Sequence, residues 1–248
     1  MKITSVNNDL VKETAKLLKT KYREESGLFL IEGEKGVEEA IQAGLNIERI
    51  FVLEGCNNFA NQNVIETTEP VLSKITDTKS APKVVAVAKQ LEYNVESLKN
   101  ANKIILLEGI KDSGNLGTIL RTATAFGIDG VILFGDTVDL YNPKCVRSTV
   151  GNLWKIPVIK IKTVEELQVS FGTYQKVATL PKNIDTIFLK EYSPTPKTIV
   201  MFGSEADGLT QALIDLSTQK VTIEMAKNVE SLNLSVSVAV IMYKIFVN

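Results

Sequence analysis

The chain has 248 residues, of which 44% are hydrophobic and 23% are charged. This composition indicates a soluble globular protein of one large or two modest domains, and it excludes a disordered or collagen-like chain. Because 28 basic residues stand against 29 acidic ones, a polyanionic partner would have to bind a local basic patch rather than an overall positive charge.

The first part of the chain has the pattern of a small α/β domain. Residues 8–23 place apolar side chains on one side of a helix. Four basic residues fall on the opposite side: Lys12, Lys16, Lys19 and Arg23. We expect this basic stripe to face outward, although an ordinary solvated helix face carries the same pattern. The pattern also predicts strands at 27–31, 50–53 and 83–88 and a helix at 37–43.

A polar stretch at 89–103 interrupts the apolar pattern. It predicts a domain at 1–92, a linker at 93–102 and a second domain at 103–248. In the second domain, short apolar runs alternate with helix-like segments. The runs are 104–107, 131–134, 156–161, 176–179, 198–202 and 220–223. This alternation predicts an α/β fold with a mostly parallel sheet and helices on both faces, so ligands should bind in the loops after the strands.

The loop after the first of these strands, within 108–122, is rich in glycine. Gly114 and Gly117 allow the backbone to approach a ligand, and Asn115 can cap the helix that follows. Arg121 is expected about one turn into that helix, where its side chain would lean back over the loop. We expect Asn115 and Arg121 to face one pocket. The alternative is a helix cap and an unrelated surface arginine.

A second loop, at 203–209, reads Gly-Ser-Glu-Ala-Asp-Gly-Leu. It is neither a phosphate-binding P-loop nor the G-x-G-x-x-G dinucleotide motif. Taken alone, it fits an ordinary strand-to-helix turn with acidic residues near the helix N-terminus.

The third element runs from Val221 into the C-terminal helix. From Leu232 onward two apolar stripes lie on different sides of this helix, which predicts burial nearly all round and a subunit interface. Ser231 and Asn233 stand at its polar start, where they could also serve only as capping residues.

The sequence contains no histidine. This excludes Ser-His-Asp and Cys-His nucleophiles, histidine zinc sites and the usual general base at neutral pH, and no metal is expected. Cys56 and Cys145 lie far apart and no export signal precedes them, so we expect reduced thiols in the cytoplasm. The longest apolar tract, 236–247, is too short to cross a bilayer, so no membrane contact is expected.

The three loop segments, in this order, resemble the three motifs of the SpoU/TrmH family of RNA ribose 2'-O-methyltransferases, within the knotted SPOUT class. The matching segments are Asn115-x-Gly117-x-x-x-Arg121-Thr122, the run 203–209, and Ile223-Glu224-Met225 followed by 231–236. The stretch 147–157 resembles the region between the first two motifs. Ala206 replaces a usual glycine and Glu224 a common proline. The N-terminal part, including 3–5, Asn8, Lys12 and 29–33, is similar to a ribosomal-protein-like substrate-binding domain.

The resemblance implies a trefoil-knotted C-terminal domain, a homodimer and S-adenosylmethionine (SAM) as cofactor. The residues implied to contact the cofactor are Gly203, Ile223 and Leu232. Those implied to line the catalytic pocket are Asn115, Arg121, Glu205, Ser231 and Asn233, with Arg121 as the base. The implied reaction is methylation of a ribose 2'-hydroxyl, with ribosomal RNA favoured over transfer RNA.

Against this background, the basic stripe is expected to meet RNA phosphates. Two alternatives stay open. One is a non-catalytic relative that binds structured RNA, and the other is an enzyme of the same fold that methylates a base. A Rossmann methyltransferase is disfavoured because the first strand of the C-terminal domain is not followed by its glycine pattern.

Overall fold

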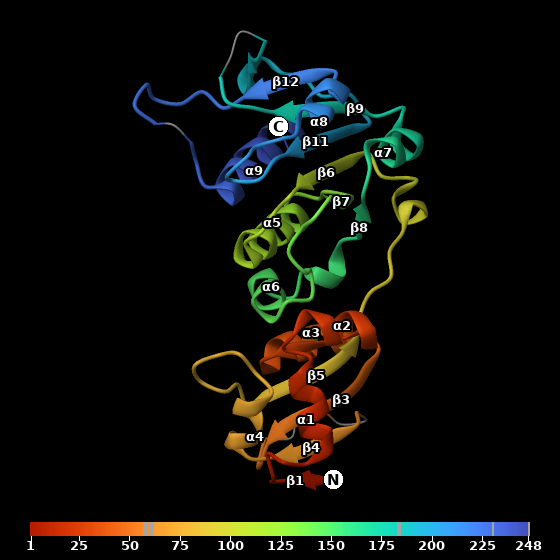
Figure 1. Cartoon of the computed structure of the whole chain (residues 1–248), viewed down its shortest axis with the longest axis vertical. Helices are drawn as coiled ribbons and strands as arrows, with labels where there is room; N and C mark the ends of the chain where they lie inside the picture. The colour runs from red at the N-terminus through yellow and green to blue at the C-terminus, as the bar shows by residue number, and fades with distance from the viewer. Residues whose placement is uncertain (57–58, 60–61, 183–184, 230, 248) are drawn as a thin grey trace. The chain divides into compact units, whose positions relative to one another are not determined.

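The computed structural model describes residues 1–56, 59, 62–182, 185–229 and 231–247 (Figure 1). The chain divides into two compact units. The first unit is Met1–Glu92 with Asp139–Trp154, and the second is Tyr93–Val138 with Lys155–Asn248. Two segments therefore group differently from the boundaries expected from the sequence. Residues 139–154 pack with the first unit, and residues 93–102 belong to the second, where Leu98 is buried in the core.

A five-stranded mixed sheet forms the centre of the first unit. Its order is β1 (Lys2–Ile3), β4 (Val64–Thr67), β3 (Ile47–Leu53), β5 (Val84–Lys89) and β2 (Leu28–Glu32). The strand β5 pairs antiparallel with both of its neighbours, whereas β1, β4 and β3 run parallel. The strands expected at 27–31, 50–53 and 83–88 are confirmed. The strands β1 and β4 were not predicted, because two and four residues are too few to show a period.

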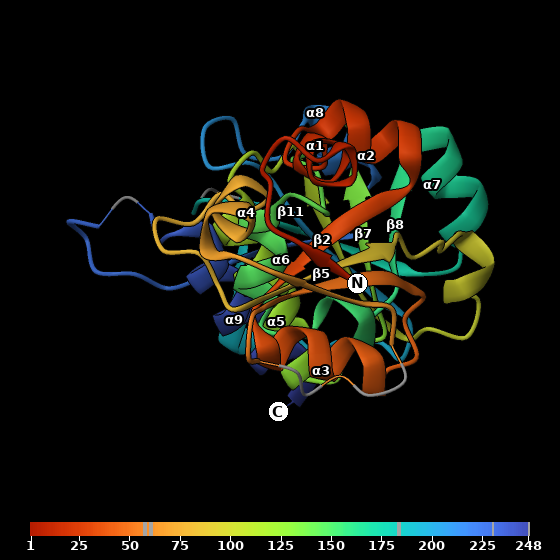
Figure 2. The same cartoon turned by 90° about the horizontal axis from the view of Figure 1, so that it is seen from below.

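Helices cover both faces of this sheet. They are α1 (Asp9–Lys16), α2 (Thr20–Ser26), α3 (Glu34–Gln42), α4 (Glu69–Lys74) and α6 (Pro143–Thr149). Apolar side chains of α1 and α4 share a core with Leu30 and Phe51 on one face. Helix α3 lies on the opposite side of the sheet from α1 (Figure 2). The short helix α6 packs against β2, where the rings of Phe29 and Tyr141 lie 4.8 Å apart.

The single helix predicted at 8–23 is wrong, because the chain forms α1 and α2 with a turn between them. Asn8 caps α1 by accepting a hydrogen bond from the Leu10 amide at 3.0 Å. Helix α1 ends at Lys16, and Lys19 is extended, with φ −106° and ψ 134°. Lys12, Lys16 and Lys19 are exposed, so three of the four predicted basic residues do face solvent.

Arg23 corrects the predicted stripe, since its side chain is only 1% exposed. Its Nε donates to Asp139 Oδ2 at 2.7 Å, its Nη1 to the Leu17 carbonyl at 2.6 Å, and its Nη2 to Thr20 Oγ1 at 3.0 Å. A buried guanidinium needs an acceptor for each nitrogen, and these three groups supply them. Arg23 therefore joins α2 to the turn before it and to Asp139, and it is not free to meet a phosphate.

The second unit is built on a seven-stranded sheet in which each pairing is parallel. Its order is β10 (Ile187–Phe188), β12 (Gln219–Thr222), β9 (Gln175–Thr179), β11 (Thr198–Phe202), β6 (Lys103–Glu108), β7 (Gly130–Phe134) and β8 (Val158–Ile161). The central strands are continuous apolar runs, as expected for strands covered on both faces. The predicted mostly parallel sheet is confirmed.

Four helices flank this sheet: α5 (Ser113–Ala125), α7 (Val164–Phe171), α8 (Gln211–Leu216) and α9 (Leu234–Met242). Shorter turns occur at Val95–Leu98, Leu153–Lys155 and Leu189–Glu191, and a π-helical turn continues α9 over Tyr243–Val247. Leu167 and Phe171 of α7 and Leu213 of α8 share one core with the sheet. Helices α5 and α9 pack against each other (Figure 1), and the rings of Phe126 and Tyr243 at their ends lie 5.7 Å apart.

Within a single chain the C-terminal helix is buried on one side only, and its expected burial on the other side would require a second subunit. Val238, Ile241 and Met242 face the core, but a second row of apolar side chains is 37% to 50% exposed. This row is Leu232, Val236, Val240, Tyr243 and Val247, here called the α9 apolar face. No helix in the described part of the chain is long and apolar enough to cross a membrane.

Candidate active site

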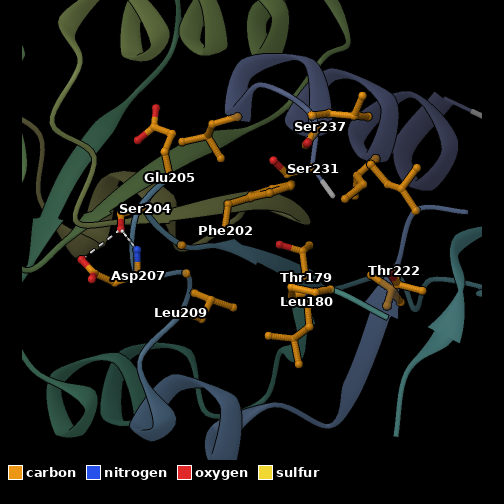
Figure 3. Close-up of a pocket in the computed structure, with 18 of the residues that line it drawn as sticks. Thr179, Leu180, Phe202, Ser204, Glu205, Asp207, Leu209, Thr222, Ser231 and Ser237 are labelled. Atoms are coloured by element: carbon orange, nitrogen blue, oxygen red, sulfur yellow. Dashed lines mark hydrogen bonds between the residues drawn. The ribbon is translucent and has the colours of Figure 1, made fainter. Parts of the chain in front are cut away.

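A cavity of about 680 Å³ lies at the carboxyl ends of three neighbouring strands of the second unit (Figure 3). Its walls are the segments that follow β9, β11 and β12, together with the start of α9. The lining residues are 179–181, 202–209, Ile214, 221–223, Met225, 231–234, Ser237 and Ile241. This is the edge of a parallel sheet at which ligands bind, and the volume is ample for a cofactor.

The loop after β11 is closed on itself by backbone hydrogen bonds. The Ser204 amide donates to the Gly208 carbonyl at 3.2 Å, and the Gly208 amide donates back to the Ser204 carbonyl at 3.1 Å. The Asp207 amide also donates to Ser204 Oγ at 3.0 Å (Figure 3). A Cβ at Gly203 would lie 1.9 Å from the Gly208 carbonyl carbon. Only glycine fits there, because the backbone of Gly208 and Leu209 packs directly against Gly203.

Glu108, at the end of β6, holds the far end of this loop. Its side chain is buried, its Oε2 accepts from the Thr210 amide at 2.7 Å and its Oε1 accepts from Thr210 Oγ1 at 2.8 Å. Thr210 is the residue before α8, so Glu108 fixes where the loop ends and the helix begins. This role of Glu108 was not predicted, although a carboxylate at the end of an apolar strand is a signal that could have marked it.

Three segments that are distant in sequence meet through Asn115. Its Nδ2 donates to Glu205 Oε1, and its Oδ1 accepts from Asn233 Nδ2 at 3.3 Å. The Asn233 side chain also caps α9 by accepting from the Ser235 amide at 2.9 Å. The loops after β6 and β11 and the start of α9 are thereby joined at the mouth of the cavity.

Asn115 is not the cap of α5, which corrects one expectation. Asp112 takes that place, and its carboxylate accepts from the Asn115 amide at 2.7 Å. The Asn115 side chain is therefore free to bridge the other two segments.

Six of the predicted site residues line the cavity: Gly203, Glu205, Ile223, Ser231, Leu232 and Asn233. Asn115 joins them through its hydrogen bonds. The structure does not bring Arg121 to this cavity within one chain. Arg121 is the ninth residue of α5 rather than one turn in, and six residues at about 100° each turn it away from the direction of Asn115. Its side chain is exposed and makes no hydrogen bond or ion pair with the residues that the structure describes.

The residues at the end of β9 and just after it also belong to the cavity, and they were not predicted from the sequence. Thr179, Leu180 and Pro181 line the cavity, and Thr179 Oγ1 donates to the Met201 carbonyl at 2.8 Å. The rule that ligands bind after parallel strands covers this loop, but no motif marks it. Ser237 and Ile241 were missed because they lie one and two turns inside α9.

The charges at the cavity are of one sign. Glu205 and Asp207 are the charged residues in its wall, and the described lining residues include no lysine or arginine. Phe202, Leu209 and Val221 supply apolar surface. The cavity therefore suits a partly apolar ligand that carries positive charge, and it does not suit a free phosphate.

Comparisons with known proteins agree with this geometry. Residues 102–243 match the model of the SpoU rRNA methylase family, and residues 8–86 match the MRM3-like substrate binding domain. The chain is 34% identical to an uncharacterized tRNA/rRNA methyltransferase of Synechocystis over 98% of this chain and 92% of that protein. It is 31% identical to the 23S rRNA (guanosine(2553)-2'-O)-methyltransferase RlmP of Bacillus subtilis over 97% of both chains.

Solved structures give the same result. The AdoMet-bound rRNA methyltransferase from Sinorhizobium meliloti superimposes with a TM-score of 0.90 at 27% identity, covering 98% of this chain and 96% of that one. A crystal structure titled RNA 2'-O ribose methyltransferase gives a TM-score of 0.83 at 31% identity, covering 98% and 97%. The resemblance found in the three motifs is confirmed, and the chain belongs to the SpoU rRNA methylase family.

Proposed function

We propose that the chain transfers a methyl group from SAM to a ribose 2'-hydroxyl in ribosomal RNA. The observation that carries this proposal is the meeting of Asn115, Glu205 and Asn233 at the mouth of a cavity built from strand-end loops. The relatives support it, because the Bacillus subtilis protein is named as a 2'-O-methyltransferase of 23S rRNA and the Sinorhizobium meliloti protein binds AdoMet.

The residues of the cavity fit SAM. Gly203 lines the cavity with backbone alone, and Ile223 and Leu232 add apolar walls. SAM carries an ammonium and a sulfonium, which the carboxylates of Glu205 and Asp207 favour. When bound, SAM supplies an electrophilic methyl group.

The contribution of the protein is to position the two reactants. Methyl transfer to oxygen is a displacement in which donor carbon and acceptor oxygen must lie in line, so orientation supplies much of the rate. The Asn115 amide fixes the Glu205 carboxylate, and Asn233 fixes Asn115 in turn. We assign Ser231, Asn233, Asn115 and Glu205 to the ribose pocket.

Arg121 is assigned to the substrate rather than to the cofactor. Its exposed, unpaired guanidinium is available for an RNA phosphate and for the negative charge that develops on the attacking oxygen. A guanidinium carries hydrogen-bond donors and no acceptor, so electrostatic stabilisation is the role its chemistry favours over that of a literal base.

The second unit is proposed to form a homodimer and a trefoil knot. The α9 apolar face carries five apolar side chains that are exposed in a single chain, and a second copy would cover them. The knot is supported by the loop at 203–209 and the segments 221–223 and 231–234, which line one cavity at the carboxyl ends of the strands.

The N-terminal domain, residues 1–92, is proposed to bind the RNA substrate, with 93–102 leading into the catalytic domain at 103–248. The match of residues 8–86 to a substrate binding domain supports this role. Exposed Lys12, Lys16 and Lys19 supply positive charge for phosphates. Since ribosomes are assembled in the cytoplasm, we place the reaction there.

The test is methylation of purified RNA with labelled SAM. The protein is incubated with ribosomal RNA and, separately, with transfer RNA, both lacking its modification, and nuclease digestion with mass spectrometry locates the label. We expect one SAM-dependent 2'-O-methyl group in ribosomal RNA, on the sugar. A label that leaves with the base would favour the alternative in which the enzyme methylates a base. If a calorimetric titration shows no SAM binding, the alternative of a non-catalytic RNA-binding relative is favoured.

A further inference from the structure

A second cavity, of about 270 Å³, lies within the first unit and has no part in the proposed reaction. The end of β2, the start of α3, and α6 with the turn after it form its walls. The lining residues are 31–36, Glu39, Val146, Arg147, Val150, Gly151 and Trp154. Here it is called the β2–α6 cavity.

Glu32 supplies this cavity with an acceptor that lacks a donor. Its side chain is 2% exposed, and its Oε2 accepts from Arg147 Nη1 at 2.9 Å. The same nitrogen of Arg147 also contacts Asp77. Oε1 of Glu32 is buried and has no hydrogen-bond partner among the described residues. Burial raises the pKa of the Glu32 carboxyl, against the opposing charge of Arg147. A buried carboxylate oxygen without a donor is costly, so a ligand that donates to it would be stabilised.

Trp154 supplies the complementary group. The residue is 8% exposed, and its Nε1 is buried without an acceptor among the described residues. An indole nitrogen is a donor only, so it requires a ligand that accepts. Two residues that line one cavity therefore carry an unpaired acceptor and an unpaired donor, and a ligand that reaches both atoms must carry both kinds of group.

The charges of the wall decide between ligand classes. Three carboxylates, Glu32, Glu34 and Glu39, stand against Arg147 and Lys35. This excess of negative charge disfavours a phosphate and favours a neutral group rich in donors. The volume lies just below the range of roughly 300–1,000 Å³ typical of drug-sized ligands, which suits a group of one or two rings.

We infer that the β2–α6 cavity binds an unpaired guanine base of the substrate RNA. Guanine carries N–H donors beside the acceptor O6, which match Glu32 Oε1 and Trp154 Nε1. Uracil also has an N–H beside a carbonyl, but it offers the carboxylate one N–H group where guanine offers two, so it is the poorer match. Single-stranded bases are read in this way, by hydrogen bonds on their edges and by aromatic side chains. The inference rests on the proposed RNA substrate and adds a base preference to it.

Trp154 makes the test direct, because it is the only tryptophan in the chain. Its emission in the full-length protein therefore reports on this cavity, when it is excited at the red edge of the indole absorption where nucleosides do not absorb. The emission is followed during titration with guanosine, with uridine, and with two short single-stranded RNAs that differ by one guanine. We expect saturable quenching by guanosine and by the guanine-containing RNA, with guanosine bound at least about tenfold more tightly than uridine.

Two variants probe the two unpaired atoms. Glu32→Gln keeps the shape of the side chain but removes its charge, and we expect it to weaken guanosine binding at least about tenfold. Glu38→Gln is the matched control, since Glu38 is exposed on α3 and does not line the cavity. Trp154→Phe keeps an aromatic ring but lacks the N–H group, and calorimetry replaces fluorescence for it. If Glu32→Gln does not fold, the guanosine affinity of Trp154→Phe tests the inference in its place.

The inference is overturned if no nucleoside and no guanine-containing RNA gives saturable quenching. Equal quenching by guanosine and uridine that Glu32→Gln leaves unchanged would also overturn it, as would binding of guanosine without binding of the RNA. The proposed function is tested separately, because SAM binding and RNA methylation are measured in the same preparations. Methylation without guanine binding would contradict only the cavity assignment, and guanine binding without methylation would contradict only the proposed reaction.

Discussion

The amide of Asn115 donates a hydrogen bond to the carboxylate of Glu205, 90 residues further along the chain. The loops after β6 and β11 are thereby fixed relative to each other at the mouth of the large cavity. Asn233 completes the arrangement by donating to Asn115 at 3.3 Å. A change at Asn115 should consequently affect the position of both partners without altering the core.

We expect Asn115→Ala to slow methyl transfer while leaving SAM bound. A hydrogen bond to a charged group contributes about 1.5–3 kcal/mol, so the rate should fall by roughly tenfold to a hundredfold. Single-turnover methylation with labelled SAM measures the rate, and calorimetry measures cofactor affinity. Asn100→Ala, at an exposed site outside the cavity, is the matched control. An unchanged rate in Asn115→Ala would remove Asn115 from the catalytic machinery.

Arg121→Lys should abolish most of the activity although the positive charge is retained. The planar guanidinium can hold a phosphate and an oxygen at once, whereas an ammonium is a point charge without that fork. Because Arg121 lies outside the cofactor cavity, SAM affinity should not change. Steady-state methylation and calorimetry together check both statements. Near-normal turnover in Arg121→Lys would rule out the role assigned to this arginine.

Gly203→Ala should weaken SAM binding at least about tenfold. The added Cβ would lie 1.9 Å from the Gly208 carbonyl carbon, so the turn at 204–208 must open and its backbone must leave the cavity wall. Calorimetric titration measures the affinity, and circular dichroism verifies that the sheet is intact. In the control Gly36→Ala, the new Cβ lies at an ordinary 3.4 Å from Ile31 in the other unit. Equal SAM affinity in the two variants would contradict the assignment of Gly203 to the cofactor.

The sequence predicted the parallel sheet well, because its strands are buried on both faces and appear as continuous apolar runs. The strands at 104–107 and 198–202 are found as β6 and β11 within one residue at each end. The same rule predicted that the loops after these strands would meet, and Asn115 and Glu205 do so. What could not be predicted is the loop after β9, since Thr179 and Leu180 belong to no motif.

Arg23 shows why helix periodicity failed in the first unit. The spacing of Lys12, Lys16, Lys19 and Arg23 fits one helix, yet the chain turns between Lys16 and Lys19. Periodicity describes only local order, whereas the orientation of Arg23 is set by Asp139, 116 residues away. A partner so distant in sequence leaves no local signal. The burial of Arg23 therefore required the structure.

Charge reversal of two of the three exposed lysines, Lys16→Glu with Lys19→Glu, should weaken RNA binding and flatten its dependence on salt. Each lost phosphate contact removes about 0.7–0.9 from the slope of log affinity against log salt concentration, so two contacts should remove about 1.5. Binding titrations at several salt concentrations measure the slope. Lys74→Glu with Lys89→Glu, at other exposed lysines of the first unit, is the matched control. If neither double variant changes the slope of log affinity against log salt concentration, Lys12, Lys16 and Lys19 form an ordinary solvated surface and do not bind RNA.

Val236→Lys with Val240→Lys should convert the proposed dimer into a monomer. Both valines belong to the α9 apolar face, at 48% and 41% exposure, and neither lines the cofactor cavity. Burying two unpaired ammonium groups against a second copy would cost several kcal/mol, so the dissociation constant should rise at least about a hundredfold. Size-exclusion chromatography with light scattering measures the mass across a range of concentrations. Val169→Lys on α7, where the valine is 88% exposed, controls for the added charge and should leave the dimer intact. A wild-type chain that stays monomeric at the highest concentration, or a double variant that stays dimeric, would show that the α9 apolar face is not the contact between subunits.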